Sequence, residues 1–297
     1  MKKNWSLYLV LLFVATSWGL TNPLAKIAVS SGYMPLGVMF WQLTVILVFS
    51  GALTFLTHRR FPFRRDTIGL FIGIACFGTL IPDYLLYLSA AHLPAGIFSI
   101  LLGLTPVFAM PVAVLLGFDK FEIRRVLGVA LGALAIAVMF GPEASLPSDV
   151  RSIFVVLTLI SAMCYAVQGN FLTWHGGADL DPVQILFGSS MAAFLAVVPS
   201  AILSNQFVDL LIPWSRVEWA ILATSVLHAF AYGGFFMLVT RGGPVFASQA
   251  AYLVTGSGVL WSMLLLGETY SAWVWVAFAL MLAGIVLLQP KKAKPAR

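Results

Sequence analysis

Residues 94–117 read PAGIFSILLGLTPVFAMPVAVLLG, and residues 244–267 read PVFASQAAYLVTGSGVLWSMLLLG. Each stretch is uncharged and longer than the ~20 apolar residues that a helix needs to cross the core of a bilayer. A shift of the chain by 150 residues brings the two stretches into register at Pro94 and Pro244, Thr105 and Thr255, and Gly117 and Gly267. This similarity predicts a membrane protein built from two related halves.

The composition excludes a water-soluble protein. Of the 297 residues, 61% are apolar and 9% are charged, and the mean hydropathy is +0.98, whereas a soluble domain has about 25% charged residues. Too few polar side chains remain to cover a surface in water, which excludes a soluble enzyme, a nucleic-acid-binding module and a disordered chain. Cys76 and Cys164 lie inside apolar runs without metal or redox spacing, so we expect them to act as small hydrophobic residues.

The apolar runs between charged and turn-forming clusters predict an all-α membrane protein with ten transmembrane helices. Ten crossings place both termini on one side, and the positive-inside rule favours the cytoplasm for that side. In this N-in/C-in arrangement most Lys and Arg residues are cytoplasmic, whereas Lys26, Arg151 and Arg216 lie outside. The predicted spans are residues 5–26, 36–57, 67–89, 94–117, 122–140, 151–173, 182–204, 216–240, 244–267 and 271–289.

The spans divide into two halves of five helices each. Residues 1–141 form the first repeat, residues 150–290 form the second, and residues 291–297 form a basic cytoplasmic tail. Because five is an odd number, the second repeat must be inverted in the membrane relative to the first. Inverted repeats place a substrate site near the middle of the membrane, where the halves meet, and this favours a transporter.

Several short motifs occur in an order and spacing typical of a known family. They are Trp18-Gly19 with Lys26, the run LPAGIFSILLGLTPVF at 93–108, Leu266-Gly267-Glu268 and Ala283-Gly284. On these motifs the chain resembles the EamA-type, ten-helix branch of the drug/metabolite transporter (DMT) superfamily over essentially its whole length. The family's Gly-Glu reads Gly117-Phe118-Asp119 in the first repeat, so a role for that acid is not carried over. The resemblance implies a secondary carrier of a bacterial inner (plasma) membrane, in many members an exporter of amino acids or other metabolites.

The sequence lacks the motifs of an ATP-driven pump or a familiar enzyme. It contains no GxxxxGK[ST] loop to bind ATP phosphates, and no HExxH or GxSxG. Gly256-Ser257-Gly258 with His228 could form an intramembrane serine hydrolase, but small residues in spans more often allow close helix packing. Asp179-Leu180-Asp181 could bind a divalent metal, but a solvated loop before Pro182 at a helix start also explains it. We therefore expect no enzyme activity, no metal site and no cofactor.

Two ionisable residues within the spans are candidates for proton coupling, because such residues are costly in a membrane. Asp83 follows Pro82, which frees the carbonyl of Gly78 from the helical ladder, so its carboxylate could carry a proton or anchor a substrate amine. Alternatively, the third span ends early and Asp83 meets water at the outer mouth. His228 could relay a proton or could be a structural residue bonded to a neighbouring helix.

Polar and aromatic side chains recur on the helix faces of several spans. Polar groups that face lipid would lack hydrogen-bond partners, so together these residues are expected to line an aqueous cavity, although any single one could be a packing contact. The candidate substrate-binding residues are Trp18, Asn22, Asp83, Tyr84, Tyr165, Gln168, His228, Tyr232, Gln249 and Tyr252.

The positions of the cations narrow the substrate class. No Lys or Arg lies in the middle of a predicted span, and a carrier for phosphate esters would need such cations. Acids, amides and aromatic faces instead favour neutral, zwitterionic or cationic amines. We predict an exporter of amino acids, aromatic or apolar ones among them, that works by alternating access with hinges at Pro106 and Gly256. The alternative within transport is an uptake permease for another small neutral or cationic metabolite.

The expected partners are a small-molecule substrate and the lipid bilayer, without nucleic acid. Gly69-x-x-x-Gly73 and Gly128-x-x-x-Gly132 have the spacing of closely packed helices. Such packing either stabilises the fold or supports a homodimer, and the sequence does not choose between them.

Overall fold

The structure is a computed structural model, and it describes residues 5–57, 59, 63–118, 122–140, 152–175, 179–208, 213–242, 246 and 249–288. Within these ranges the regular secondary structure is helical, without a β-strand. Six helical segments are long and apolar enough to cross a membrane, and Ala250–Leu266 and Ala272–Leu288 are shorter apolar helices. The prediction of an all-α, multi-pass membrane protein is confirmed.

The helices follow one another through the two halves of the chain. The first half contains α1 (Trp5–Ser30), α2 (Pro35–Leu56), α3 (Arg65–Ala75), the π-helix η1 (Cys76–Leu80), α4 (Ile81–Ala90), α5 (Ala95–Gly103), α6 (Thr105–Leu115) and α7 (Ile123–Phe140). The second half contains α8 (Ser152–His175), α9 (Pro182–Leu203), α10 (Arg216–Gly242), α12 (Ala250–Leu266) and α13 (Ala272–Leu288).

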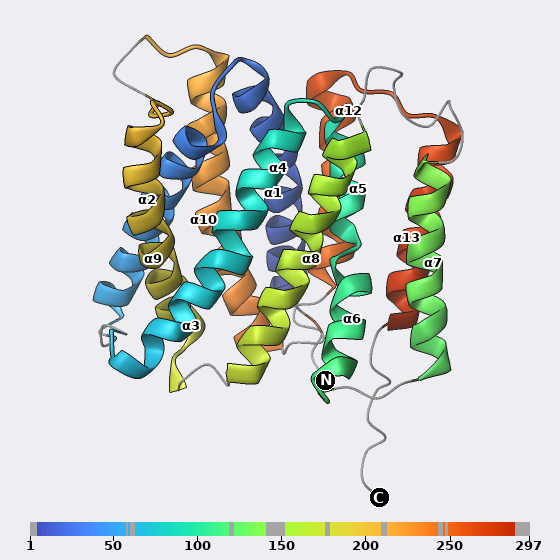
Figure 1. Cartoon of the computed structure of the whole chain (residues 1–297), viewed down its shortest axis with the longest axis horizontal. Helices are drawn as coiled ribbons and strands as arrows, with labels where there is room; N and C mark the ends of the chain where they lie inside the picture. The colour runs from blue at the N-terminus through green and yellow to red at the C-terminus, as the bar shows by residue number, and fades with distance from the viewer. Residues whose placement is uncertain are drawn as a thin grey trace, which may run out of the picture.

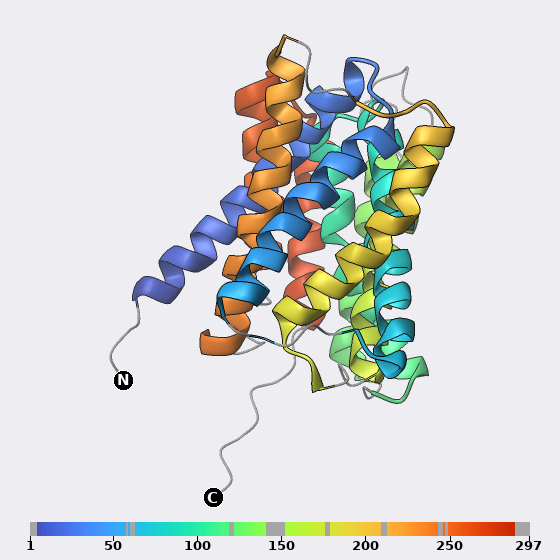
Figure 2. The ribbon, with the colours of Figure 1, turned by 90° about the vertical axis from the view of Figure 1, so that its left-hand side faces the viewer.

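The two halves of the chain pack against each other, and helices at equivalent places make equivalent contacts with the opposite half (Figure 1). Helix α1 packs on α10 and α12, and its counterpart α8 packs on α4, α5 and α6. In the same way α2 packs on α9, while α7 and α13 lie side by side at one edge of the bundle. We call the end of the bundle where α1 begins and α13 finishes the terminal end, and the end where α1 finishes the distal end (Figures 1 and 2).

Two of the predicted spans are interrupted. The span predicted at 67–89 contains η1, in which the backbone N–H of Ile81 bonds the carbonyl of Cys76, five residues back. A wide turn here is consistent with Pro82, which cannot donate the next ladder bond. The span predicted at 94–117 breaks at Leu104, so that Pro106 is the second residue of α6. Its counterpart Gly256 lies inside the continuous helix α12.

Helices α7 and α13 approach so closely that no side chain fits between them at their contact. A Cβ atom on Gly128 would lie 2.7 Å from the carbonyl oxygen of Gly284, and a Cβ on Gly284 would lie 2.7 Å from that of Gly128. Gly69, in contrast, has nothing within 4 Å of such a Cβ. The close-packing prediction therefore holds at Gly128, and at Gly73, where an added Cβ would clash with the ring of Phe171 on α8, but it is wrong at Gly69, which faces away from the other helices.

Candidate functional site: a polar cavity between the two halves

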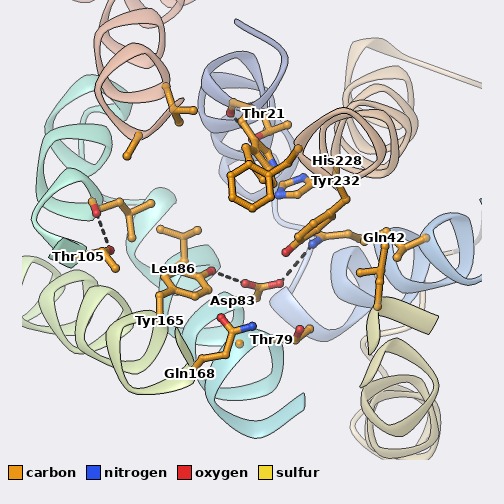
Figure 3. Close-up of a pocket in the computed structure, with 18 of the residues that line it drawn as sticks. Thr21, Gln42, Thr79, Asp83, Leu86, Thr105, Tyr165, Gln168, His228 and Tyr232 are labelled. Atoms are coloured by element: carbon orange, nitrogen blue, oxygen red, sulfur yellow. Dashed lines mark hydrogen bonds between the residues drawn. The ribbon is translucent and has the colours of Figure 1, made fainter. Parts of the chain in front are cut away.

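A cavity of about 700 Å³ lies inside the bundle (Figure 3). Residues of α1 to α6 line it from the first half, and residues of α8, α9, α10 and α12 line it from the second. This volume is within the range of about 300–1,000 Å³ that is typical of small-molecule sites. Its place between the repeats is the one that the sequence predicts for a substrate site.

The cavity extends further toward the terminal end than toward the distal end. Its lining reaches Pro182 and Ala250, which are the first residues of α9 and α12. On the distal side the lining residues Ala25, Tyr87 and Ser99 lie about one turn inside the ends of their helices. The path into the cavity is therefore shorter from the terminal end than from the distal end.

Asp83 is the acidic group of the cavity. Its side chain is 8% exposed, and α4 continues beyond it to Ala90. The alternative that the helix ends early, leaving Asp83 at a mouth, is therefore wrong. Tyr165 on α8 donates to Oδ1 at 2.5 Å, and Gln42 on α2 donates through Nε2 to Oδ2 at 3.2 Å (Figure 3). The carboxyl group thus connects both halves of the chain through three helices.

An aromatic cluster lies across the cavity from Tyr165. The ring of Trp18 lies 5.2 Å from that of Tyr232 and 5.5 Å from that of Phe235. In Figure 3 the Tyr232 side chain points toward Asp83. His228 adjoins this cluster, and its Nδ1 lies 3.3 Å from the carbonyl oxygen of Thr224 on its own helix. The cluster offers aromatic faces to an apolar or cationic group.

Two amide side chains complete the polar lining. Asn22 on α1 donates through Nδ2 to Oγ of Ser99 on α5 at 2.7 Å. Gln168 on α8 fits against the bare backbone of Gly78, where an added Cβ would lie 2.6 Å from the amide carbon. Gly78 belongs to η1, so the interrupted helix makes room for a polar group at the cavity wall.

The charge of the lining is one-sided. Among the described residues that line the cavity, Asp83 is the one acid, and none is Lys or Arg. An anionic substrate such as a phosphate ester would find no cation to pair with it there. An ammonium group, in contrast, could pair with the carboxylate.

The structure brings together most of the candidate site residues. Trp18, Asn22, Asp83, Tyr165, Gln168, His228 and Tyr232 all line the cavity. Tyr84, Gln249 and Tyr252 are not among the lining residues. The Tyr252 hydroxyl donates instead to the carbonyl of Ile285 on α13 at 3.0 Å, and Gln249 is an exposed residue at the start of α12.

Gln42 is the principal residue that the sequence reasoning missed. It is 4% exposed, and it bonds both Asp83 and Tyr87. An amide in the middle of the apolar run MFWQLTVILV is itself a signal, because it needs partners away from lipid.

The distal end of the cavity is closed by charged contacts around the turn between α4 and α5. Lys26 on α1 donates through Nζ to the carbonyl of Leu93 at 2.5 Å. Glu268, after α12, accepts from the backbone N–H groups of Ala95 at 2.8 Å and Gly96 at 3.2 Å. Tyr270 donates to Glu268 at 2.5 Å. A cation thus binds carbonyls after α4 and an anion binds the N-terminus of α5, as the helix dipoles favour.

Comparison with known proteins gives two findings. A family model described as the EamA-like transporter family matches the chain twice, at residues 5–141 and 152–289. A solved structure, named only "Crystal structure of protein", aligns with a TM-score of 0.62 over 94% of this chain and 95% of its own, at 16% sequence identity. At that identity the likeness concerns the fold alone. None of the curated proteins matches the chain.

Proposed function

Because the chain belongs to the EamA-like transporter family, and is thus a membrane transporter of small solutes, we propose that it exports amino acids with aromatic or apolar side chains. The observation that carries this proposal is the buried Asp83, the one acid among the described residues of a cavity lining that has an aromatic cluster and no Lys or Arg. The ammonium group of an amino acid would pair with the carboxylate. The side chain of the bound amino acid would pack against Trp18 and Phe235.

We propose ten crossings, with the terminal end in the cytoplasm and the protein in the inner membrane. The Lys and Arg distribution supports this orientation, and α7 and α10 would supply the two crossings beyond the eight apolar helical segments. The longer reach of the cavity toward the terminal end would let it load from the cytoplasm, as export requires. Opening the opposite end would release the substrate, with Pro106 and Gly256 as the proposed hinges.

Counterflow in ATP-free proteoliposomes tests this function. Vesicles loaded with unlabelled amino acids receive labelled phenylalanine, methionine, threonine or a sugar phosphate in separate reactions. We expect label to accumulate above the level of protein-free vesicles, most for phenylalanine, less for methionine and least for threonine. The reason is that the aromatic cluster should bind larger apolar side chains more tightly. Accumulation of the sugar phosphate, or of no amino acid, would contradict the proposed substrate class.

Loss of the Glu268 carboxylate is expected to open the distal end. Glu268→Gln removes charged hydrogen bonds to the start of α5, each worth about 1.5–3 kcal/mol, and should shift the population toward distal opening. With Ala25→Cys as a reporter in a background without Cys76 and Cys164, an impermeant maleimide added at the distal face should react about tenfold faster. Glu122→Gln, at the start of α7, is the matched control. Equal labelling rates in both variants would show that Glu268 does not hold the distal end closed.

A further inference from the structure

Gln42 uses both ends of its amide, and the two ends face different chemical partners. Its carbonyl oxygen accepts a hydrogen bond from the Tyr87 hydroxyl, and its Nε2 donates to Oδ2 of Asp83 at 3.2 Å. The reverse orientation would bring the amide oxygen against a carboxylate oxygen, which is unfavourable when Asp83 is ionised. The ionised carboxylate therefore sets the direction in which the amide points, and the hydroxyl of Tyr87, which is 2% exposed, donates to the amide oxygen in that orientation.

The two oxygens of the Asp83 carboxyl group are consequently not equivalent. Oδ2 faces an NH₂ group, which can only donate, whereas Oδ1 faces the hydroxyl of Tyr165, which can donate or accept. A proton on Oδ2 would have no acceptor unless the amide turned over. A proton on Oδ1 needs only a rotation of the Tyr165 hydroxyl, which then accepts the new O–H bond.

We propose that Gln42 is a positioning residue that directs proton uptake by Asp83 to Oδ1, on the side of Tyr165. This inference rests on the proposed transport function and takes Asp83 in the proton-coupling role for which the sequence makes it a candidate. In the balanced step the carboxylate and one proton form a carboxylic acid with its O–H at Oδ1. The Tyr165 hydroxyl rotates, keeps its own hydrogen and changes from donor to acceptor.

The consequence is a link between protonation and the contact of the two halves. Gln42 and Asp83 belong to the first half and Tyr165 to the second, so the hydroxyl that changes its role lies across the boundary between them. Among the described residues that line the cavity, the titratable groups besides Asp83 and Tyr165 are Tyr87 on the helix of Asp83, and Tyr232 and His228 on α10. From α1, the cation Lys26 is engaged at the distal end by the carbonyl of Leu93.

The pH profile of transport tests the role of Gln42. Gln42→Leu removes a donor that stabilises the ionised carboxyl group, so the pH of half-maximal transport should rise by about one unit, a tenfold change in proton affinity. Tyr87→Phe removes the donor to the amide oxygen of Gln42 and should shift the profile in the same direction by less. Ser50→Ala is the matched control, because Ser50 is buried on the same helix and its hydroxyl donates to the backbone carbonyl of Ile46, one turn earlier in that helix.

Asp83→Asn distinguishes failure of this inference from failure of the proposed function. If Asp83→Asn removes the pH dependence and Gln42→Leu keeps the wild-type profile, Gln42 has no positioning role and the function stands. If Asp83→Asn keeps the wild-type pH dependence, the proton-carrying role itself is wrong. Should Gln42→Leu fail to fold, the pH profile of Tyr87→Phe tests the inference instead. This variant is a smaller change, because it deletes one hydroxyl and retains the ring. A profile of Tyr87→Phe identical to the wild type would then overturn the inference.

Discussion

Replacing Asp83 with Asn is expected to reduce amino-acid counterflow about 10- to 100-fold at neutral pH. The substitution keeps the shape of the side chain but removes its charge and its ability to exchange a proton. Hydrogen bonds to charged groups contribute about 1.5–3 kcal/mol, and each 1.4 kcal/mol corresponds to a factor of ten. The loss should be large because the described cavity lining has no second carboxylate to take over the role of Asp83.

The matched control is Asp66→Asn, the same substitution near the start of α3. Asp66 is exposed and pairs with Arg64 at 2.7 Å, outside the cavity. We expect this variant to transport like the wild type, because exposed ion pairs contribute little. Equal activity of the two variants would rule out a transport role for Asp83.

Tyr165→Phe separates the carboxyl group from its strongest partner. It removes the donor that lies 2.5 Å from Oδ1 of Asp83 and retains the aromatic ring. We expect a loss of about tenfold, at the lower end of the range for Asp83→Asn, because one hydrogen bond to a charged group is lost, worth at least about 1.5 kcal/mol, and the charge itself remains. If Asp83 holds the substrate amine, Asp83→Asn should act mainly on KM. If it carries a proton, the pH dependence should disappear instead.

Much of this fold could be predicted from the length and spacing of the apolar runs. A helix that crosses a bilayer has to satisfy its backbone internally, so an uncharged run such as 94–117 has few alternatives to a helix. The sequence predicts a disturbed helical ladder at Gly78 and a hinge at Pro106, but not that they take the form of a π-helix and a break at Leu104. The π-helix contains Gly78, which lies against Gln168, and hydropathy contains no information on such a contact.

The candidate site was predictable where polar residues must avoid lipid, and less so where a helix has two buried faces. Asp83, Tyr165 and Gln168 line the cavity as the pattern predicts. Tyr252 lies on a helix that packs against α1 and α5, and its hydroxyl turns to α13. Sequence alone does not say which buried face borders the cavity. The contact of Glu268 with the start of α5 joins residues that are 173 positions apart, so no local pattern indicates it.

Gly19→Ala is expected to lower the thermal stability of the purified protein substantially. A Cβ atom at this position would lie 2.7 Å from the backbone nitrogen of Gly258 and 2.9 Å from the carbonyl oxygen of Val254, both on α12. Backbone atoms cannot rotate away as a side chain can, so α1 and α12 would have to separate. Overpacking of this kind costs typically about 1–3 kcal/mol, and at about 2–4 °C per kcal/mol the unfolding midpoint in detergent should fall by several degrees.

Gly69→Ala provides the control, because nothing lies within 4 Å of a Cβ there, and alanine is the better helix former. Its unfolding midpoint should equal or exceed that of the wild type. Ser257→Gly should not rescue Gly19→Ala, because the backbone contacts of α12 remain after the Ser257 hydroxyl is removed. Equal midpoints for the Gly19 and Gly69 variants would show that α1 and α12 are not in backbone contact. Trp18 and Asn22 flank this contact and line the cavity. A separation of α1 from α12 in Gly19→Ala should therefore also reduce transport, because the geometry of the site depends on the packing of α1.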